Sequence, residues 1–301
     1  MRAWVLHGIN NYRLCDVPIP IAKDGEILVK VKAAGICSSD IARVYSTGAY
    51  HYPIIPGHEF SGETADGRRV GVFPLIPCFE CESCNKAHYE TCSNYSYIGS
   101  RQDGAFAEYV TVPEWNLIEL PDDMPYEAAA LLEPAAVALH AVQQLDLTCV
   151  NAAAIVGDGA IGRLIAKWLA IYGVNNIAIV GKLDKISVDV DACFEAAGNV
   201  NALRRCIELA KPDGQLVLVG NPDVDFSIDQ KLYWQILRKQ LTIRGSWNSQ
   251  YPANWKETLT NADKLMLDEL ITHRYAFAEL DNAFEMMRTK SGKHIKVITA
   301  I

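Results

Sequence analysis

Four cysteines with two, two and seven residues between them lie in one short segment: Cys78, Cys81, Cys84 and Cys92. Zinc prefers four donors at the corners of a tetrahedron, with sulfur about 2.3 Å from the metal. The C-x2-C-x2-C run lets a tight loop place three thiolates around one ion, and Cys92 supplies the fourth. Because four thiolates leave no coordination position open, we predict a structural zinc site. An iron–sulfur cluster or free thiols are the alternatives, but this self-contained loop brings no further cluster ligands, which favours zinc.

The bulk composition is that of a globular protein without a membrane segment. Half of the 301 residues are apolar, and the net charge of −8 argues against nucleic acid or an anionic membrane as a partner. The first residues do not follow a signal-peptide pattern, and no run of about 18 apolar residues could span a bilayer. The odd count of nine cysteines disfavours a disulfide framework. We therefore expect a cytoplasmic protein.

The pattern of apolar residues divides the chain into two parts. The first third is rich in short strands, and residues 61–73 are typical of a hairpin around Asp66-Gly67. From about residue 126 the pattern turns helical and then alternates between strands and helices, which indicates a parallel sheet. We expect strands at 152–156, 176–180, 192–195, 215–219, 241–244 and 294–301, and a helix at 161–172. The predicted domains of this α/β chain are residues 1–145 with 272–301, and residues 146–271.

A glycine-rich turn, G-x-G-x-x-G, joins the strand at 152–156 to the following helix. In this context it is a dinucleotide-binding fingerprint, whereas alone it would be weak evidence. Gly157 permits the tight turn, Gly159 lets the backbone approach the pyrophosphate, and Gly162 lets the helix pack closely. Ala160 and Ile161 begin the helix, whose N-terminus favours phosphate charge. The alternative is a glycine-rich turn that binds no ligand.

The second strand of the predicted parallel sheet, residues 176–180, is followed by Gly181-Lys182. At this position a carboxylate would normally bind the ribose hydroxyls of the dinucleotide. Lys182 is compatible with the 2′-phosphate of NADP, and equally with an ordinary surface lysine, so NAD(H) and NADP(H) both stay open. Residues 182–191 are too few for another helix and a parallel crossover. We therefore predict an abbreviated sheet edge that lacks the usual third strand and its helix.

Four further residues have the chemistry of an open metal site: Cys37, His58, Glu59 and Glu133. One cysteine, one histidine and one glutamate would make a three-ligand zinc with a free fourth position, which is the catalytic arrangement. Each residue also has a plain structural interpretation when taken alone. Cys37 could be a core thiol, His58 a buried hydrogen-bonded ring, and Glu133 a helix cap.

These motifs together resemble the zinc-containing medium-chain alcohol dehydrogenases. The matching text, in the family's order, is G-I-C-S-S-D at 35–40, P-G-H-E-F-S-G at 56–62, the cysteine quartet, D-G-A-F-A-E-Y at 103–109, L-L-E-P at 131–134 and V-G-D-G-A-I-G at 156–162. The resemblance implies a GroES-like catalytic domain and a Rossmann domain. It also implies that Cys37, His58 and Glu133 bind a catalytic zinc, with Glu59 as a ligand in some states or as a neighbouring group.

The resemblance is strongest to the polyol branch of that family, which includes sorbitol and galactitol-phosphate dehydrogenases. It implies hydride transfer between a nicotinamide cofactor and a secondary alcohol or ketone, with Ser39 relaying the substrate proton. Ser39 could instead, or in addition, be a helix N-cap. Arg43 could reach a substrate hydroxyl or phosphate, or be a surface arginine, and Glu133 is a second candidate for substrate contact.

Two other functions remain open from the sequence. Gly181-Lys182 and the abbreviated sheet edge, on the side where the adenine would bind, are compatible with an NADPH-dependent sugar-phosphate reductase. The abbreviated nucleotide domain is compatible with a zinc-stabilised, nucleotide-binding protein that is not an enzyme, although the Cys37, His58 and Glu133 set opposes this. Residues 241–247 resemble the sheet edge that pairs between subunits in the family, so we expect a homodimer or homotetramer.

Overall fold

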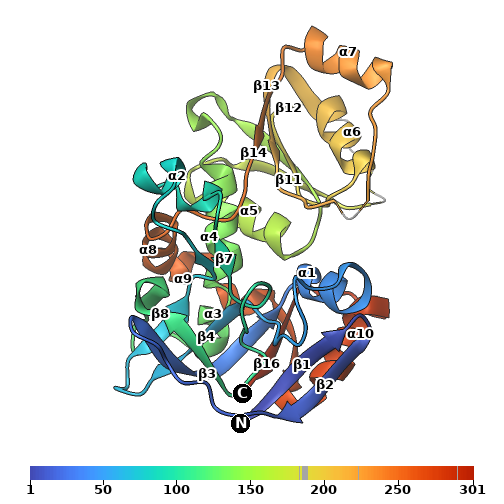
Figure 1. Cartoon of the computed structure of the whole chain (residues 1–301). Coiled ribbons are helices and arrows are strands. Elements are labelled where there is room, and N and C mark those ends of the chain that lie inside the picture. Colours follow the sequence, from blue (N-terminus) through green and yellow to red (C-terminus); the bar gives the residue numbers. More distant parts are fainter. Residues whose placement is uncertain (183, 185–188, 223, 290) are drawn as a thin grey trace. The chain divides into compact units, whose positions relative to one another are not determined.

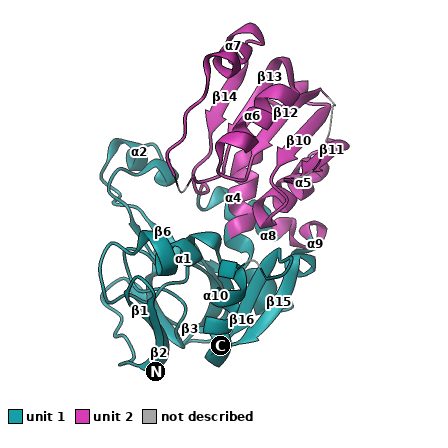
Figure 2. Cartoon of the chain, turned by 90° about the vertical axis from the view of Figure 1, so that its right-hand side faces the viewer, with its two compact units in different colours: residues 1–133, 251–259, 266–301 teal, residues 134–250, 260–265 magenta. Residues whose placement is uncertain are grey.

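The computed structural model describes the whole chain except residues 183, 185–188, 223 and 290. The chain folds into two compact units, coloured separately in Figure 2. Unit 1 comprises residues 1–133, 251–259 and 266–301, and unit 2 comprises residues 134–250 and 260–265. The first division falls at the start of helix α4 (Leu132–Val142), where Ala135 accepts a hydrogen bond from the indole N–H of Trp168 in unit 2. The predicted domains, divided at 145/146 and 271/272, place these limits elsewhere and stay a prediction.

Unit 1 is built on a seven-stranded sheet (Figure 1). The strand order is β15-β16-β3-β4-β5-β9, and β8 pairs with β3 outside this path. β16 (Lys296–Ala300), near the end of the chain, pairs antiparallel with β3 (Glu26–Ile36), so distant parts of the sequence meet in one sheet. The other strands are β4 (Glu59–Thr64), β5 (Arg69–Val72), β8 (Tyr109–Pro113), β9 (Leu117–Glu119) and β15 (Ile271–Ala276).

The predicted hairpin at 61–73 is confirmed. β4 and β5 pair antiparallel with Ser61 opposite Gly71, and the turn lies at Asp66-Gly67. Gly67 has a φ of +85°, a conformation that glycine adopts at no steric cost. The strands place valines and isoleucines of alternate positions in one core, which includes Val29, Val31 and Val70.

Short elements complete unit 1. β1 (Arg2–Gly8) and β2 (Asn11–Asp16) form a separate antiparallel pair, and β6 (Leu75–Ile76) pairs with β7 (Ser96–Tyr97). The helices are α1 (Ser38–Ala42), α2 (Glu82–Asn85), α3 (Tyr126–Ala129), α8 (Ala253–Thr260) and α10 (Leu280–Thr289). α1 follows β3 directly, and α2 lies inside the cysteine loop.

Unit 2 is a parallel sheet of five strands in the order β11-β10-β12-β13-β14. The strands are β10 (Ala152–Val156), β11 (Asn176–Val180), β12 (Val190–Glu195), β13 (Ala210–Leu218) and β14 (Thr242–Gly245), and the helices are α5 (Ala160–Ile171), α6 (Val200–Leu209), α7 (Gln230–Arg238) and α9 (Ala262–Leu265). The first two strands have the predicted bounds. β13 begins at Ala210 rather than at residue 215, because it pairs with Val190 at its start.

The abbreviated sheet edge is confirmed in the part of unit 2 that the structure describes. β11 is the outer strand of the sheet, and no described strand pairs with its free side, where the third strand of a Rossmann sheet would lie. Losing an edge strand leaves the inner strands fully paired, which is why the sheet tolerates the loss. Among the described helices of the chain, none is long and apolar enough to cross a membrane.

Candidate active site and metal centres

The cysteine quartet forms a compact cluster of sulfur atoms in unit 1. Adjacent Sγ atoms are 3.5 to 4.0 Å apart, from Cys81–Cys84 and Cys92–Cys78 at 3.5 Å to Cys78–Cys84 at 4.0 Å. Sulfurs at about 2.3 Å from a tetrahedral zinc would lie about 3.8 Å from one another. The spacing of the donors therefore fits one zinc ion with four thiolates.

The thiols of the quartet differ in their pKa. Backbone N–H groups of Cys84 and Ser93 lower the pKa of Cys81 to about 5. Burial raises the pKa of Cys84 to about 12, and its thiol shares hydrogen bonds with Cys81 and Cys92. Adjacent thiolates repel one another, so a divalent cation is what would allow all four to ionise together.

Contacts between aromatic rings connect the cysteine loop to the rest of unit 1. The Trp115 ring lies 5.0 Å from the rings of Phe79 and Tyr89, both inside the loop. On its other side it lies 4.8 Å from Tyr251, which stacks on Phe73 at 4.7 Å. These ring contacts hold the loop at several points.

A second group of donors gathers where β3 ends and β4 begins. Cys37 is the N-cap residue of α1, directly after β3, and His58 precedes β4, which starts at Glu59. The donor atoms of Cys37, His58 and Glu59 all lie within 4.8 Å of one another. β3 and β4 are paired neighbours, so the sheet itself brings these distant sequence motifs together.

Glu133, the fourth predicted donor, lies near this group but outside the tight set of three. Its Oε1 accepts a hydrogen bond from the hydroxyl of Tyr97 at 3.4 Å. Burial raises the pKa of Glu133 to about 7, against the opposing charges of His58 and Lys296. The Tyr97 ring also lies 5.8 Å from the His58 ring. Sequence reasoning missed Tyr97, and only its position just after the cysteine loop could have suggested it.

Asp40 connects the metal donors to Arg43. The fully buried carboxylate of Asp40 lies 3.3 Å from Nδ1 of His58 and 3.1 Å from Nη1 of Arg43. It also accepts a hydrogen bond from the backbone N–H of Cys37 at 3.1 Å. Burial works to raise the pKa of Asp40, but His58 and Arg43 outweigh it, and the pKa is lowered. Arg43 therefore forms an ion pair with a carboxylate of the site. Arg43 also lines a small hollow of about 320 Å³ with residues 47–50.

Ser39 is the second residue of α1 and is half-buried. The alternative that Ser39 caps this helix is wrong, because Cys37 occupies the N-cap position. The role of Ser39 as proton relay stays a prediction.

Lys296 is a second residue that sequence reasoning missed. It is 4% exposed and forms an ion pair with Glu59, which is 1% exposed. Burial works to lower the pKa of Lys296, but Glu59 and the neighbouring Cys37 and Glu133 outweigh it and raise the pKa. Lys296 is thus a buried cation beside the candidate zinc donors.

The glycine-rich turn of unit 2 lies between β10 and α5. Gly157 has a φ of +134°, and a Cβ there would meet the carbonyl group of Ala196. A Cβ on Gly162 would meet the carbonyl oxygen of Gly157, so α5 packs closely on the turn. Open space surrounds Gly159, the N-cap residue of α5, and Ala160 and Ile161 form the first turn of that helix.

Two carboxylates lie at the end of β11. The N–H of Gly181 donates to Oδ2 of Asp184 at 2.8 Å. Oδ2 of Asp158 lies 3.6 Å from where a Cβ on Gly181 would be. Lys182 is exposed. The environment of Gly181 is therefore negatively charged rather than positively charged.

Comparisons with known proteins agree with this arrangement. Residues 23–122 match the alcohol dehydrogenase GroES-like domain, and residues 128–301 match the glucose dehydrogenase C-terminus. The chain is 34% identical to galactitol 1-phosphate 5-dehydrogenase of Escherichia coli K12, covering 90% of this chain and 92% of that one. It is 30% identical to sorbitol dehydrogenase of Halalkalibacterium halodurans, covering 97% and 96%. The crystal structure of galactitol-1-phosphate dehydrogenase from Escherichia coli superimposes over both whole chains with a TM-score of 0.91 and 32% identity.

The chain belongs to the zinc-dependent medium-chain polyol dehydrogenases. This membership confirms the predicted GroES-like and Rossmann-type folds and makes the chain an oxidoreductase. In this polyol dehydrogenase both donor clusters lie within unit 1, and the glycine-rich turn lies in unit 2.

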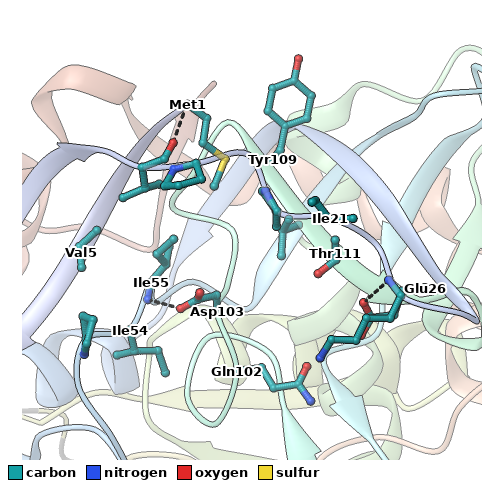
Figure 3. Close-up of a pocket in the computed structure, with 16 residues that line it drawn as sticks. Met1, Val5, Ile21, Glu26, Ile54, Ile55, Gln102, Asp103, Tyr109 and Thr111 are labelled. Atoms are coloured by element: carbon teal, nitrogen blue, oxygen red, sulfur yellow. Dashed lines mark hydrogen bonds between the residues drawn. The ribbon is translucent and has the colours of Figure 1, made fainter.

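A second hollow of the polyol dehydrogenase, of about 590 Å³, is lined by other residues (Figure 3). It lies against β1 and β8, where Met1, Val5 and Tyr109 form part of its wall. Asp103 accepts a hydrogen bond from the N–H of Ile55 at its edge. None of the zinc donors lines this hollow, so its volume gives no information about the candidate site.

Proposed function

We propose that this polyol dehydrogenase interconverts a secondary alcohol of a polyol or sugar-alcohol phosphate and the matching ketone. The observation that carries the proposal is the cluster of Cys37, His58 and Glu59 donors, with Glu133 beside them. Three protein ligands with a free fourth position are characteristic of catalytic zinc. The names of the relatives point to the same substrate class for this chain.

The proposed roles of the residues follow from their places. Cys37, His58 and Glu133 would hold the catalytic zinc, with Glu59 as a ligand in some states or as a neighbouring group. Cys78, Cys81, Cys84 and Cys92 would hold the structural zinc. A zinc ion at the first site would supply Lewis acidity toward a substrate oxygen. Ser39 would accept the substrate proton, and Asp40 would orient the ring of His58.

Glu133 and Arg43 are the proposed substrate contacts. Arg43 already neutralises Asp40, so its remaining N–H groups would face a substrate hydroxyl or phosphate from the hollow that it lines. An arginine can serve both partners because its guanidinium carries five donors in a fixed fork.

Unit 2 would bind the dinucleotide at the turn of Gly157, Gly159 and Gly162, with Ala160 and Ile161 facing the phosphates. Asp158 and Asp184 surround Gly181, where the ribose of the adenosine would lie. A 2′-phosphate would meet two negative charges there, against the single exposed Lys182. We therefore propose NAD(H) as the cofactor rather than NADP(H). The two carboxylates beside Gly181 therefore disfavour the alternative of an NADPH-dependent sugar-phosphate reductase.

The proposed assembly is a homodimer through β14. All four residues of β14 are exposed, and among the described strands it pairs only with β13. Ile243 and Trp247, at and just beyond this edge, are 38% and 51% exposed. A sheet edge that no described strand covers is a ready surface for pairing with another strand. Further association to a homotetramer and a cytoplasmic location remain part of the proposal.

The test is a screen for nicotinamide reduction. The protein is mixed with NAD+ or NADP+ and a panel of polyols and polyol phosphates, and nicotinamide absorbance is followed. We expect turnover with at least one secondary alcohol of the panel, faster with NAD+, and loss of turnover in Cys37→Ser. Failure on the whole panel with both cofactors would favour the second alternative, a zinc-stabilised nucleotide-binding protein that is not an enzyme.

A further inference from the structure

Glu195 is a buried carboxylate in unit 2 that the proposed function does not use. It is the last residue of β12 and is 5% exposed. Its Oε1 accepts hydrogen bonds from the backbone N–H groups of Ala197 at 2.9 Å and Gly198 at 2.7 Å. Among the residues that the structure describes, none forms an ion pair with this carboxylate. Glu195 therefore brings a buried negative charge that no described cation of the chain neutralises.

Glu195 lies at the point of the sheet where the strand order reverses. β11 pairs with one side of β10, and β12 pairs with the other side (Figure 2). Glu195 is directly opposite Val156, the residue before the glycine-rich turn, and the N–H of Ala196 donates to the carbonyl oxygen of Val156 at 2.9 Å. In open parallel sheets, ligands bind in the crevice outside the carboxyl ends of the strands at this reversal. The Glu195 carboxylate is therefore next to the expected dinucleotide crevice.

The strand order also assigns Glu195 to one half of the dinucleotide. The adenosine ribose binds at the end of the second strand, here β11, so β10 and β11 belong to the adenosine half. β12, β13 and β14 make up the other half, which is left for the nicotinamide nucleotide. Glu195 thus supplies a negative charge on the nicotinamide side, whereas Asp158 and Asp184 lie beside Gly181 on the adenosine side.

The surrounding backbone fixes the position of this charge. The carbonyl oxygen of Glu195 accepts hydrogen bonds from the N–H groups of Val219 and Gly220, just after β13, both at 2.9 Å. A Cβ on Gly220 would lie 2.6 Å from Oε2 of Glu195 and would also meet the backbone nitrogen of Gly198. The turns after β12 and β13 therefore close on the Glu195 side chain and leave it little contact with water.

We propose that Glu195 makes the nicotinamide half of the site prefer the oxidised cofactor NAD+ over NADH. This rests on the part of the proposed function in which unit 2 binds NAD(H). The nicotinamide ring carries a positive charge when oxidised and none when reduced, so a carboxylate on its side of the crevice stabilises only the oxidised form. The attraction is strong because a buried charge is poorly screened by water and salt. A site with this preference loads NAD+ and releases NADH, which suits alcohol oxidation.

The test compares the Kd values of NAD+, NADH and ADP-ribose, which is the dinucleotide without its nicotinamide. Isothermal titration calorimetry on the full, zinc-loaded chain gives all three values. Glu195→Gln removes the charge but keeps an oxygen that can accept the two N–H groups. In this variant the Kd of NAD+ rises about tenfold relative to that of NADH. The Kd of ADP-ribose does not change, because this ligand has no ring for the carboxylate to stabilise.

Three further variants separate the charge from damage to the turn. Glu195→Ala is a second neutral variant and shows the same change in the ratio of the NAD+ and NADH Kd values. Glu195→Asp keeps the charge on a shorter side chain, so it retains the native ratio. Glu208→Gln, at an exposed glutamate of α6 in the same unit, is the matched control and leaves all three Kd values unchanged. Circular dichroism confirms that each variant is folded.

The outcomes are distinct. A native ratio of the NAD+ and NADH Kd values in a folded Glu195→Gln or Glu195→Ala chain overturns the inference, and so does a tenfold change in Glu195→Asp. If the native chain binds both cofactors but turns over no polyol, the proposed function fails while this inference is still decided by the ratio. If the native chain binds neither NAD+ nor NADH, both fail together.

Discussion

Nδ1 of His58 lies 3.3 Å from Oδ1 of Asp40, and both side chains are buried. The carboxylate fixes the orientation of the ring and leaves Nε2 for a metal. Arg43 holds the same carboxylate at 3.1 Å from the other side. A histidine ligand oriented by a carboxylate in this way is a more basic and better-placed donor than a free imidazole.

Asp40→Asn is expected to weaken the catalytic metal site without affecting the quartet. The amide cannot supply the charge that orients His58, so zinc affinity and activity fall by about 10- to 100-fold. Zinc titration in competition with a chelator measures the affinity, and Asp24→Asn, at an exposed position, is the matched control. Equal affinities for Asp40→Asn and the native chain would show that the carboxylate has no such role.

Cys84→Ser is expected to reduce stability, whereas Cys37→Ser is expected to abolish activity with little change in stability. Loss of one thiolate from a closed site removes folding free energy, so Cys84→Ser lowers the Tm by roughly 10 °C or causes aggregation. Cys37→Ser loses activity but keeps its Tm within a few degrees. Differential scanning calorimetry beside an activity assay makes the comparison. A Cys84→Ser chain as stable as the native one would contradict the structural assignment.

Trp115→Ala is expected to loosen the cysteine loop. Its ring contacts Phe79 and Tyr89 on one side and Tyr251 on the other, so truncation costs about 2–3 kcal/mol, less than for a fully buried tryptophan. Zinc should leave the quartet faster when a colorimetric chelator is added. The control is Tyr233→Ala, at a residue that is 51% exposed. The same release rate in both variants would mean that the aromatic contacts do not hold the loop.

Asp184→Ser is expected to reduce discrimination against NADPH. It removes one of the two carboxylates beside Gly181, and one charge near a 2′-phosphate changes affinity by about tenfold. Fluorescence titration with NADH and NADPH gives the ratio of the two Kd values, and Lys182→Met is the control for the opposite charge. A ratio that stays constant in Asp184→Ser would argue that this carboxylate does not face the ribose.

The sequence predicted the parts that depend on spacing along the chain. The cysteine quartet, the hairpin at Asp66-Gly67 and the strand before the glycine-rich turn each follow from residues close in sequence. The pairing of β3 with β4 then brings Cys37 and His58 together. The resemblance to a family, rather than any local pattern, is what grouped these two residues beforehand.

The remaining features depend on tertiary contacts that no local pattern reveals. Lys296 reaches Glu59 only because β16 pairs with β3 and Gly35 leaves room. The pairing of Arg43 with Asp40, a buried residue three positions earlier, is likewise invisible in the sequence pattern. The negative surroundings of Gly181 likewise come from Asp158, in a different turn of the chain.

Zinc content per chain tests the central claim most directly. Elemental analysis by mass spectrometry is applied to the native chain and to Cys37→Ser after extensive dialysis. A catalytic and a structural site predict two zinc ions in the native chain and one in the variant. One zinc ion in both proteins would contradict the account, because the cluster of Cys37, His58 and Glu59, with Glu133 beside it, would then hold no metal.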